Sequence, residues 1–415
     1  MIERSWLPYD SNTDFPLQNI PFGVARYGNK SLVVSRIGDW LINLSELAEE
    51  SWIPQMPGLQ DGILWPECEI LRDVRNELQN LLREENRDLR DHALTKTAIF
   101  PCSDKIHMEL PIVPNAYVDF YSGIHHATNV GKMFRPDMPP LLPNYRHLPV
   151  AYNGRANTVN VYNSIARPSG QTKANDETFP KFGPTKELDF ELELGFYLGK
   201  ESRPGVSIPI QEAERYILGF VLVNDWSARD VQRWEYQPLG PFLAKSFATG
   251  VSPWLVLLDA LEPFRCQGQV QDPSPLPYLQ QIGGGHFNIE LQVKLQTSGS
   301  HSPQLISQTN TRELYWTPAQ QLAHQSSNGT KVEGSDLYAS GTISSEKPHP
   351  DGLGAFGSML ELTWRGQNPL TILETDEERK FLEDGDTVTF TGFGQGDGFR
   401  VGFGEISTTI RPASS

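Results

Sequence analysis

The sequence has few cysteines and few basic residues for its length. Its 415 residues include only three cysteines, Cys68, Cys102 and Cys266, which lie far apart and form no CxxC pair. This pattern predicts neither a disulfide framework nor a cysteine zinc site, and it fits a reducing compartment. Lys and Arg total 35 against 51 Asp and Glu, which gives a net charge of -16. Because phosphate binding needs clustered Lys and Arg, we expect no nucleic-acid partner, and cation binding is the more natural expectation.

Long apolar runs and several common catalytic motifs are also missing. No apolar segment approaches the roughly 20 residues that a membrane-spanning helix needs, and the first residues contain no hydrophobic signal segment. We therefore expect a cytoplasmic protein with no membrane partner. The chain has no GxSxG, HExxH or GxxxxGKS/T pattern. Serine acyl-enzyme, zincin and nucleotide-dependent chemistries are therefore disfavoured.

The first part of the chain combines a short β pattern with an amphipathic helix. Strand-like residues 31–36 and 40–44 are joined through Gly38 and Asp39, which predicts a tight hairpin. Between residues 67 and 90 apolar residues recur at helical spacing, and we expect one helix there. Proline-rich residues 111–114 favour a boundary between two domains, 1–115 and 116–415.

The second part is predicted to be mostly β. Residues 189–198 alternate, with apolar side chains on one face and Asp189, Glu191 and Glu193 on the other. Residues 287–295 also alternate, and residues 387–404 combine strand-like sequence with glycines. We therefore expect a mainly β (α+β) fold.

Residues 217–254 contain the most informative stretch of the sequence. A continuous apolar run that ends at Asn224 predicts a strand buried on both faces. Asp225 is expected to be the N-cap of a helix on which Arg229, Gln232 and Tyr236 share one face. Lys245 follows in a loop rich in Gly and Pro. This polar set is consistent with the wall of a pocket, although a capping Asp and a solvated helix surface are the structural alternative.

Four acidic residues form a possible cation site. Glu191 and Glu193 would have Cα atoms about 6.6 Å apart on a strand, close enough for both side chains to reach one ion. With Asp119 and Asp225 they make an all-oxygen set, which suits a hard divalent cation such as calcium or magnesium. The alternative is a solvent-facing strand with incidental acids. His126, which is also near this set in motif order, carries little weight alone because most histidines are structural.

The chain resembles the fumarylacetoacetate hydrolase family in six strings: DFYSGIHHATNVGKMFR, HLPVAYNGRA, LDFELELGF, NDWSARDVQRWEYQPLGPFLAKSF, ASGTIS and GSMLEL. The likeness extends from residues 14–16 to residues 395–398, which is nearly the whole chain. It implies an N-terminal SH3-like β domain followed by a mixed β-roll catalytic domain that forms a homodimer. It also implies a small-molecule substrate.

Matching the family position by position implies two cation sites. The residues that match calcium ligands are Asp119, Glu191, Glu193 and Asp225. The residues that match positions around a second, structural magnesium ion are Asp225, Lys245 and Thr249.

The same matching implies catalytic and substrate-binding roles. His126 matches the residue that activates water, and Glu361 matches the carboxylate that orients it. The residues that match oxyanion and leaving-group stabilisers are Arg229, Gln232 and Lys245. The residues that match substrate contacts are Tyr121, Arg135, Tyr152, Gln232, Tyr236 and Thr342.

The resemblance implies hydrolysis of the carbon–carbon bond of 4-fumarylacetoacetate to fumarate and acetoacetate, the last step of tyrosine and phenylalanine catabolism. One alternative is a relative on the same scaffold that acts on acylpyruvates or 2-oxo acids. The long N-terminal region argues against it, because such proteins resemble mainly the second domain. Another alternative is a non-catalytic calcium-binding β protein. A pure binding module would need none of His126, Glu361 and Lys245.

Overall fold

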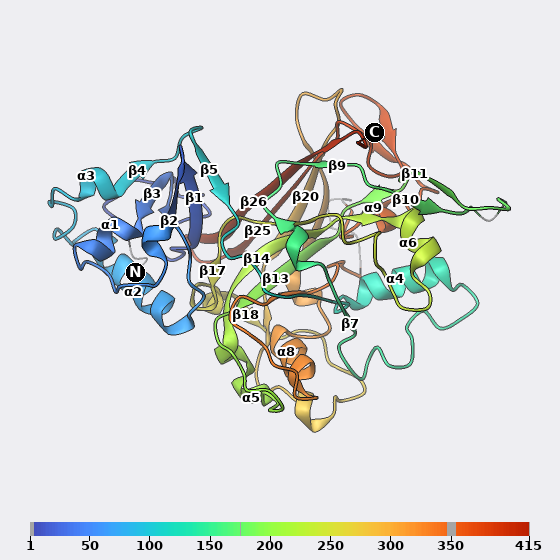
Figure 1. The fold of residues 1–415 in the computed structure, drawn as a ribbon, viewed down its shortest axis with the longest axis horizontal. Coiled ribbons are helices and arrows are strands. Elements are labelled where there is room, and N and C mark those ends of the chain that lie inside the picture. The colour runs from blue at the N-terminus through green and yellow to red at the C-terminus, as the bar shows by residue number, and fades with distance from the viewer. Residues whose placement is uncertain (1–3, 175, 347–353, 415) are drawn as a thin grey trace.

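The computed structural model describes residues 4–174, 176–346 and 354–414. The N-terminal part forms a five-stranded antiparallel sheet with the order β4-β3-β2-β1-β5 (Figure 1, blue). Its strands are β1 (Phe22–Tyr27), β2 (Lys30–Ile37), β3 (Trp40–Asn43), β4 (Ile99–Pro101) and β5 (Ile106–Glu109). The predicted hairpin is confirmed, since β2 pairs with β3 and Gly38 adopts a φ of 53° in the turn.

The predicted amphipathic helix is confirmed, but the helix is shorter than predicted. Helix α2 (Cys68–Leu82) buries Leu71, Val74 and Leu78 against the N-terminal sheet, but it ends eight residues before residue 90. At its end the Leu82 carbonyl accepts a hydrogen bond from the Trp6 amide at 3.2 Å, and Arg83 pairs with Ser5. The N-terminal segment therefore takes over the backbone partners that a longer helix would have used.

The second part of the chain contains two larger sheets. One has eight strands: β6 (Tyr117–Phe120), β7 (Ala151–Asn153), β8 (Val159–Asn160), β13 (Leu192–Leu198), β14 (Ile217–Asp225), β16 (Thr249–Val251), β17 (Val256–Leu257) and β22 (Leu337–Ala339). The other has five strands: β9 (Ser164–Ala166), β20 (Glu290–Gln296), β21 (Gln304–Asn310), β25 (Thr387–Gln395) and β26 (Arg400–Arg411). Parallel pairs such as β6 with β22 occur among antiparallel ones. The predicted mainly β fold, an SH3-like domain followed by a mixed β-roll, is confirmed.

Two-stranded ladders and short helices complete the fold. The ladders are β10 (Ser169–Thr172) with β11 (Lys181–Pro184), β12 (Leu188–Asp189) with β15 (Ser227–Ala228), β18 (Arg265–Cys266) with β19 (His286–Phe287), and β23 (Leu370–Ile372) with β24 (Glu377–Arg379). The remaining helices are α1 (Leu44–Glu49), α3 (Thr95–Ala98), α4 (Ile124–Phe134), α5 (Ile210–Ala213), α6 (Arg229–Glu235), α7 (Leu258–Leu261), α8 (Pro318–Ser326) and α9 (Met359–Leu362). In the described part of the chain, no helix is both long and apolar enough to cross a membrane.

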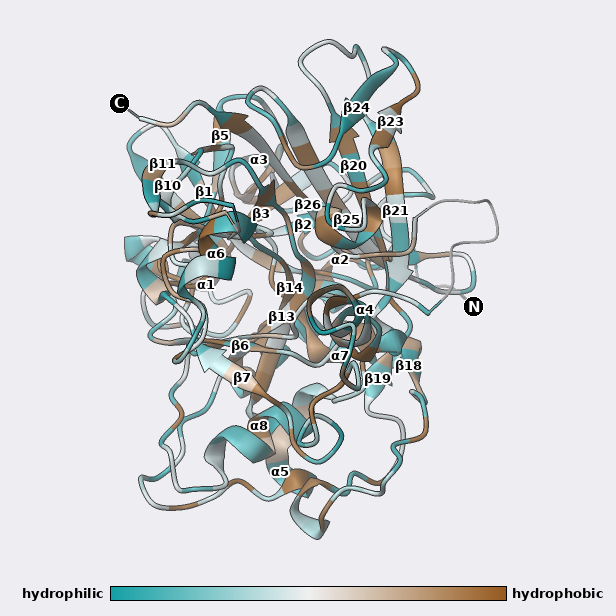
Figure 2. Ribbon diagram, turned by 90° about the vertical axis from the view of Figure 1, so that its right-hand side faces the viewer, coloured by the Kyte–Doolittle hydropathy of each residue, from teal (hydrophilic) through white to brown (hydrophobic). Residues whose placement is uncertain are grey.

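Strand β14 is buried on both faces, as its apolar sequence predicts. Phe220 and Leu222 pack in the core of the second part of the chain, whereas Val221 and Val223 pack in a core shared with the N-terminal region. Figure 2 shows hydrophobic residues along β14 through the middle of the molecule. The division at residues 115 and 116 stays a prediction, and the two parts of the chain share one of their cores.

Two local predictions around the central strands are wrong. Asp225 is the last residue of β14 and caps no helix, because Ser227 and Ala228 first pair with β12 and Ala228 is the N-cap of α6. Residues 189–198 form two strands rather than one, and every residue of β12 and β13 is buried. The solvent-facing alternative for these acids is therefore also wrong.

A substitution at Gly341 would test how tightly the end of β22 is held. Gly341 has a φ of 76°, and an added Cβ would lie 2.2 Å from the carbonyl oxygen of Phe120. Gly28 has a φ of 60°, and its Cβ would meet no described atom within 4 Å. Gly28→Ala should lower the free energy of unfolding by about 1 kcal/mol, the strain of a left-handed residue. Gly341→Ala should lower it by more in chemical denaturation, and equal losses would contradict this packing.

Candidate active site

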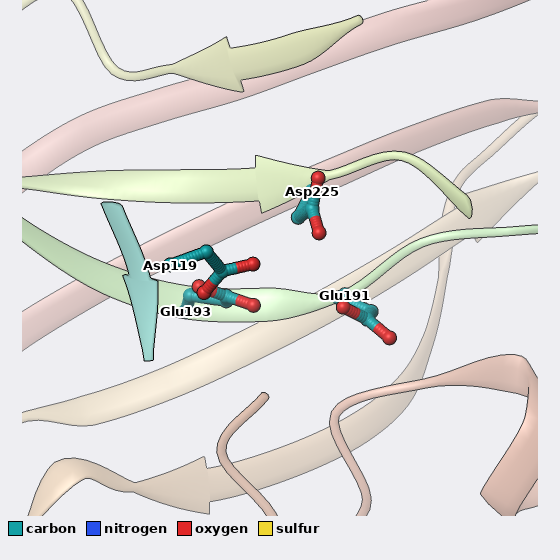
Figure 3. A group of neighbouring side chains, drawn as sticks. All are labelled: Asp119, Glu191, Glu193 and Asp225. Carbon is teal, nitrogen blue, oxygen red and sulfur yellow. The ribbon is translucent and has the colours of Figure 1, made fainter. Parts of the chain in front are cut away.

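Four carboxylates meet at the ends of strands in the eight-stranded sheet. Asp119 lies on β6, Glu191 just before β13, Glu193 on β13 and Asp225 at the end of β14. One oxygen of each lies within 4.8 Å of the others. Figure 3 shows the four side chains gathered around one space. The structure therefore brings together the four residues that the sequence proposed for one cation.

Strand β22 ends beside the acidic cluster. Ala339, its last residue, pairs with Asp119 of β6, and β22 also separates β6 from β13. Beyond it the chain turns at Gly341, whose amide donates to Glu193 Oε2 at 3.0 Å. The segment after β22 stays between the two neighbouring strands, because the Ser340 amide donates to the Leu194 carbonyl at 3.0 Å and the Ser122 amide donates to the Ser340 carbonyl at 2.9 Å.

Three of the four carboxylates are buried and only partly paired. Asp119, Glu193 and Asp225 are at most 3% exposed. Burial raises the pKa of each above its ordinary value, and the neighbouring carboxylates raise it further. Among the described residues, Asp119 Oδ1, Glu193 Oε1 and Asp225 Oδ1 have no hydrogen-bond partner. Unpaired buried carboxylate oxygens are the donors that a hard divalent cation needs, so the cluster fits such an ion.

Two buried cations hold Glu191. Arg229 Nη1 lies 2.6 Å from Glu191 Oε1, and Lys245 Nζ contacts Glu191 Oε2. Burial alone would raise the pKa of Glu191, but these two charges outweigh it and hold the pKa below its ordinary value. Glu191 is therefore a carboxylate in the folded protein.

Lys245 and Tyr152 also bind Asp225. Lys245 Nζ lies 2.6 Å from Asp225 Oδ2, and the Tyr152 hydroxyl donates to the same oxygen at 3.0 Å. Burial alone would lower the pKa of Lys245, but Asp225 and Glu191 raise it. An ammonium group has no lone pair, so the Lys245 side chain cannot be a ligand of a second cation. Only its backbone carbonyl could serve beside Asp225 and Thr249, which face each other across β14 and β16.

His126 and Glu361 form a buried pair beside the acidic cluster. His126 Nδ1 lies 2.6 Å from Glu361 Oε2, and both residues are almost fully buried. Burial alone would raise the pKa of Glu361, but His126 and the hydrogen bonds of Asn129 and Ser358 lower it. Glu361 is thus held as a carboxylate against the imidazole.

Sequence reasoning missed the residues that surround Glu361. Ser344 Oγ and Ser358 Oγ each donate to Glu361 Oε2 at 2.9 Å, and Asn129 Nδ2 donates to Oε1 at 2.9 Å. Ser358 is the N-cap of α9, and its spacing to Glu361 matches the Ser-x-x-Glu signature of a capping box. That signature was the available sequence signal for Ser358, whereas Asn129 and Ser344 had none.

The other predicted residues lie at different depths. The Tyr121 ring packs edge-on against His126 at 5.6 Å between centroids, and Thr342 is buried next to Gly123. Gln232 Oε1 accepts from Arg229 Nη1 at 3.2 Å. Tyr236 is exposed at the end of α6. Arg135 ends α4 and donates to the Pro140 carbonyl at 3.0 Å, so it belongs to the loop that follows α4.

Calcium should stabilise the folded protein through this cluster. At 100 times its dissociation constant, calcium should raise the free energy of unfolding by about 2.7 kcal/mol, measured as a rise in melting temperature. Glu193→Gln should remain folded and lose most of this rise, because one ligand charge is gone. Asp386→Asn, which changes a buried carboxylate paired with Arg379, should keep the rise. An undiminished rise for Glu193→Gln would exclude Glu193 from the site.

Calcium affinity should also depend on pH. Because the pKa values of Asp119, Glu193 and Asp225 are raised, these groups hold protons at pH values where ordinary carboxyls have lost them. Calcium binding should release those protons, and the affinity should fall as the pH drops through the raised pKa values. Calorimetry in buffers of different ionisation enthalpy would measure the release. An affinity that is flat from pH 5 to 8, with no proton release, would contradict this linkage.

Comparisons with known proteins identify the family of the chain. The family described as Fumarylacetoacetase N-terminal matches residues 18–111, and the one described as Fumarylacetoacetate (FAA) hydrolase C-terminal matches residues 115–411. The fumarylacetoacetase of Homo sapiens is 44% identical over 420 residues, and that of Caenorhabditis elegans is 43% identical over 422 residues. The Arabidopsis thaliana fumarylacetoacetase is 41% identical over 429 residues. In each comparison 99% of both chains is covered.

A solved structure shares the fold. The fumarylacetoacetate hydrolase from Exiguobacterium antarcticum superposes with a TM-score of 0.51 at 13% identity, covering 95% of this chain and 99% of the other. At this identity the likeness concerns the fold alone. The two family matches span most of the chain, and the sequence relatives span nearly all of it, so the chain belongs to the fumarylacetoacetase family.

Proposed function

We propose that this protein hydrolyses the carbon–carbon bond of 4-fumarylacetoacetate to give fumarate and acetoacetate, the last step of tyrosine and phenylalanine catabolism. The observation that carries the proposal is the buried His126–Glu361 pair beside an all-carboxylate cluster. Full-length likeness to fumarylacetoacetases supports the choice of substrate.

His126 is proposed to be the general base. Its Nδ1 is engaged with Glu361, which fixes the tautomer and leaves Nε2 to accept a proton from water. The hydroxide so formed attacks one carbonyl carbon of the 1,3-diketone. Glu361 orients the ring and stabilises the charge that the ring acquires.

Arg229, Gln232 and Lys245 are proposed to stabilise the oxyanion and the leaving group. Among the described residues, Arg229 Nη2 has no partner although the side chain is only 5% exposed, so it is a donor free for substrate. Lys245 uses two of its three ammonium hydrogens on Glu191 and Asp225, which leaves one. Donors held in place before the reaction stabilise charge that develops in the transition state.

Cleavage then breaks the carbon–carbon bond. The electron pair leaves with the acetoacetate fragment as its enolate, and the proton held on His126 is available to that carbon. The other fragment is fumarate. A calcium ion held by Asp119, Glu191, Glu193 and Asp225 would supply Lewis-acid stabilisation of the enolate oxygens.

A second, structural magnesium ion is proposed beside Asp225 and Thr249. Lys245 would take part only through its carbonyl oxygen, for the reason given above. The substrate contacts proposed are Tyr121, Arg135, Tyr152, Gln232, Tyr236 and Thr342. Of these, Tyr121 and Tyr152 already contact members of the site.

We also propose a cytoplasmic homodimer with domains 1–115 and 116–415. Exposed apolar side chains support a partner surface, since Phe179, Phe182 and Leu239 are 77%, 78% and 98% exposed. Light scattering after size exclusion would measure the oligomeric state.

The assay that tests the function follows the loss of fumarylacetoacetate by absorbance, with and without a chelator. Turnover should need a divalent cation and should return when calcium is added after chelation. The absence of turnover with calcium present would refute the proposed reaction.

The neighbouring histidines allow a matched test of the base. His126→Ala should lower kcat by about 10² to 10⁴, with KM little changed, because the general base is lost. His125→Ala is the control, since His125 Nε2 points to Glu313 at 3.3 Å rather than to Glu361. Its kcat should change much less.

Glu361→Gln should cause an intermediate loss, and adding it to His126→Ala should change little, because the two residues act as one unit. An inactive His125→Ala together with an active His126→Ala would show that the base is misassigned.

A further inference from the structure

Asp189 is a fully buried carboxylate that joins two parts of the site. It is 0% exposed, and it accepts four hydrogen bonds. Oδ1 accepts from the amides of Phe190 at 2.8 Å and Met359 at 2.7 Å, and Oδ2 accepts from the Leu360 amide at 3.1 Å and from Arg229 Nε at 2.8 Å. Each carboxylate oxygen therefore accepts two hydrogen bonds.

On one side, Asp189 accepts a hydrogen bond from Nε of Arg229. Its bond to Nε leaves the other end of the guanidinium to contact Glu191 and Gln232 through Nη1. The pairing of β12 with β15 places Asp189 opposite Ser227, two residues before Arg229. The carboxylate thereby fixes the direction in which the guanidinium points.

On the other side, Asp189 holds the first turn of α9. Met359 and Leu360 are the first residues of this four-residue helix, and Glu361 comes next. Such a short helix has few internal hydrogen bonds, so its position depends on outside partners. Two of its first amides bind Asp189 and that of Glu361 binds Ser358 Oγ at 3.3 Å.

We propose that Asp189 is a positioning residue that holds the guanidinium of Arg229 and the carboxylate of Glu361 at a fixed separation. The inference rests on the function proposed above. The hydrogen bonds described for the Asp189 carboxylate do not include His126, and Asp189 acts through Arg229, the proposed oxyanion stabiliser, and Glu361, which orients the base. It thus fixes the position of the oxyanion-binding group, Arg229, relative to the His126–Glu361 pair that activates water.

Asp189→Asn tests the inference with almost no change in volume. An asparagine side chain has one acceptor oxygen, and its amide nitrogen only donates. Whichever way the amide is turned, either the amides of Phe190 and Met359 or the Leu360 amide and Arg229 Nε lose their acceptor. The variant should lower kcat by about 10- to 100-fold, as for residues that orient catalytic groups, and KM should change little.

Asp386→Asn is the matched control. Asp386 is also 0% exposed and is also paired with an arginine and an amide, because it accepts from Arg379 Nε at 3.0 Å and from the Glu383 amide at 2.8 Å. It contacts neither α4 nor α9 through these bonds. The Asp386→Asn substitution should lower the melting temperature and leave kcat of the folded protein unchanged.

Double-variant cycles separate positioning from general destabilisation. Asp189→Asn should be less than multiplicative with Arg229→Lys and also with Glu361→Gln, because both partners act through the same carboxylate. Asp386→Asn should be multiplicative with each. If Asp189→Asn does not fold, Asp189→Ser, which keeps one acceptor and leaves room for water, takes its place.

The outcomes are distinct. Undiminished kcat in Asp189→Asn, a loss equal to that of Asp386→Asn, or coupling to only one of the two partners would each overturn the positioning role while the proposed reaction stands. If the unmodified protein does not cleave fumarylacetoacetate, the proposed function falls, and the inference falls with it.

Discussion

The structure depends on holding four carboxylates in one buried space. Like charges so close together repel, and burial removes the water that would screen them. Glu191 is balanced from within the chain by Arg229 and Lys245, whereas Asp119, Glu193 and Asp225 each keep one unpaired oxygen among the described residues. The charge of the cluster is therefore only partly compensated by the chain. A divalent cation is the simplest complement, since one oxygen of each carboxylate lies within 4.8 Å of the others.

A rigid sheet is what keeps this arrangement from relaxing. Strand β14, which ends in Asp225, contributes Phe220 and Leu222 to one core and Val221 and Val223 to the other. A strand packed on both faces cannot shift by one residue without moving every side chain to the wrong side. The N-terminal region, which carries none of the proposed site residues, therefore contributes by covering the back of the strands that do.

Patterns that are local in the sequence predicted much of this fold. The continuous apolar run of β14, the hairpin at Gly38 and the proximity of Glu191 to Glu193 in one acidic cluster all depend on near neighbours, and the structure agrees with each. The errors have long-range causes. The helix after Asp225 is delayed because Ser227 and Ala228 pair with β12, about forty residues earlier, and α2 ends early because Trp6 takes its last carbonyl. The roles assigned to single residues came from the family resemblance, since one sequence cannot show that residues 126 and 361 meet.

The base side of the site is built differently from the cation side. Three of the acids lie on fully buried strands and Glu191 lies just before one of them, but Glu361 lies on a helix of only four residues, which cannot be stable by itself. Its carboxylate receives hydrogen bonds from Ser344, Ser358 and Asn129 as well as from His126. His126 lowers the pKa of Glu361, and the hydrogen bonds of Asn129 and Ser358 lower it further without adding a second positive charge. Among its described hydrogen-bond partners, the imidazole is the one that can take up a proton and be stabilised by this carboxylate, and the precision of that pair comes from tertiary contacts rather than from the helix that carries Glu361.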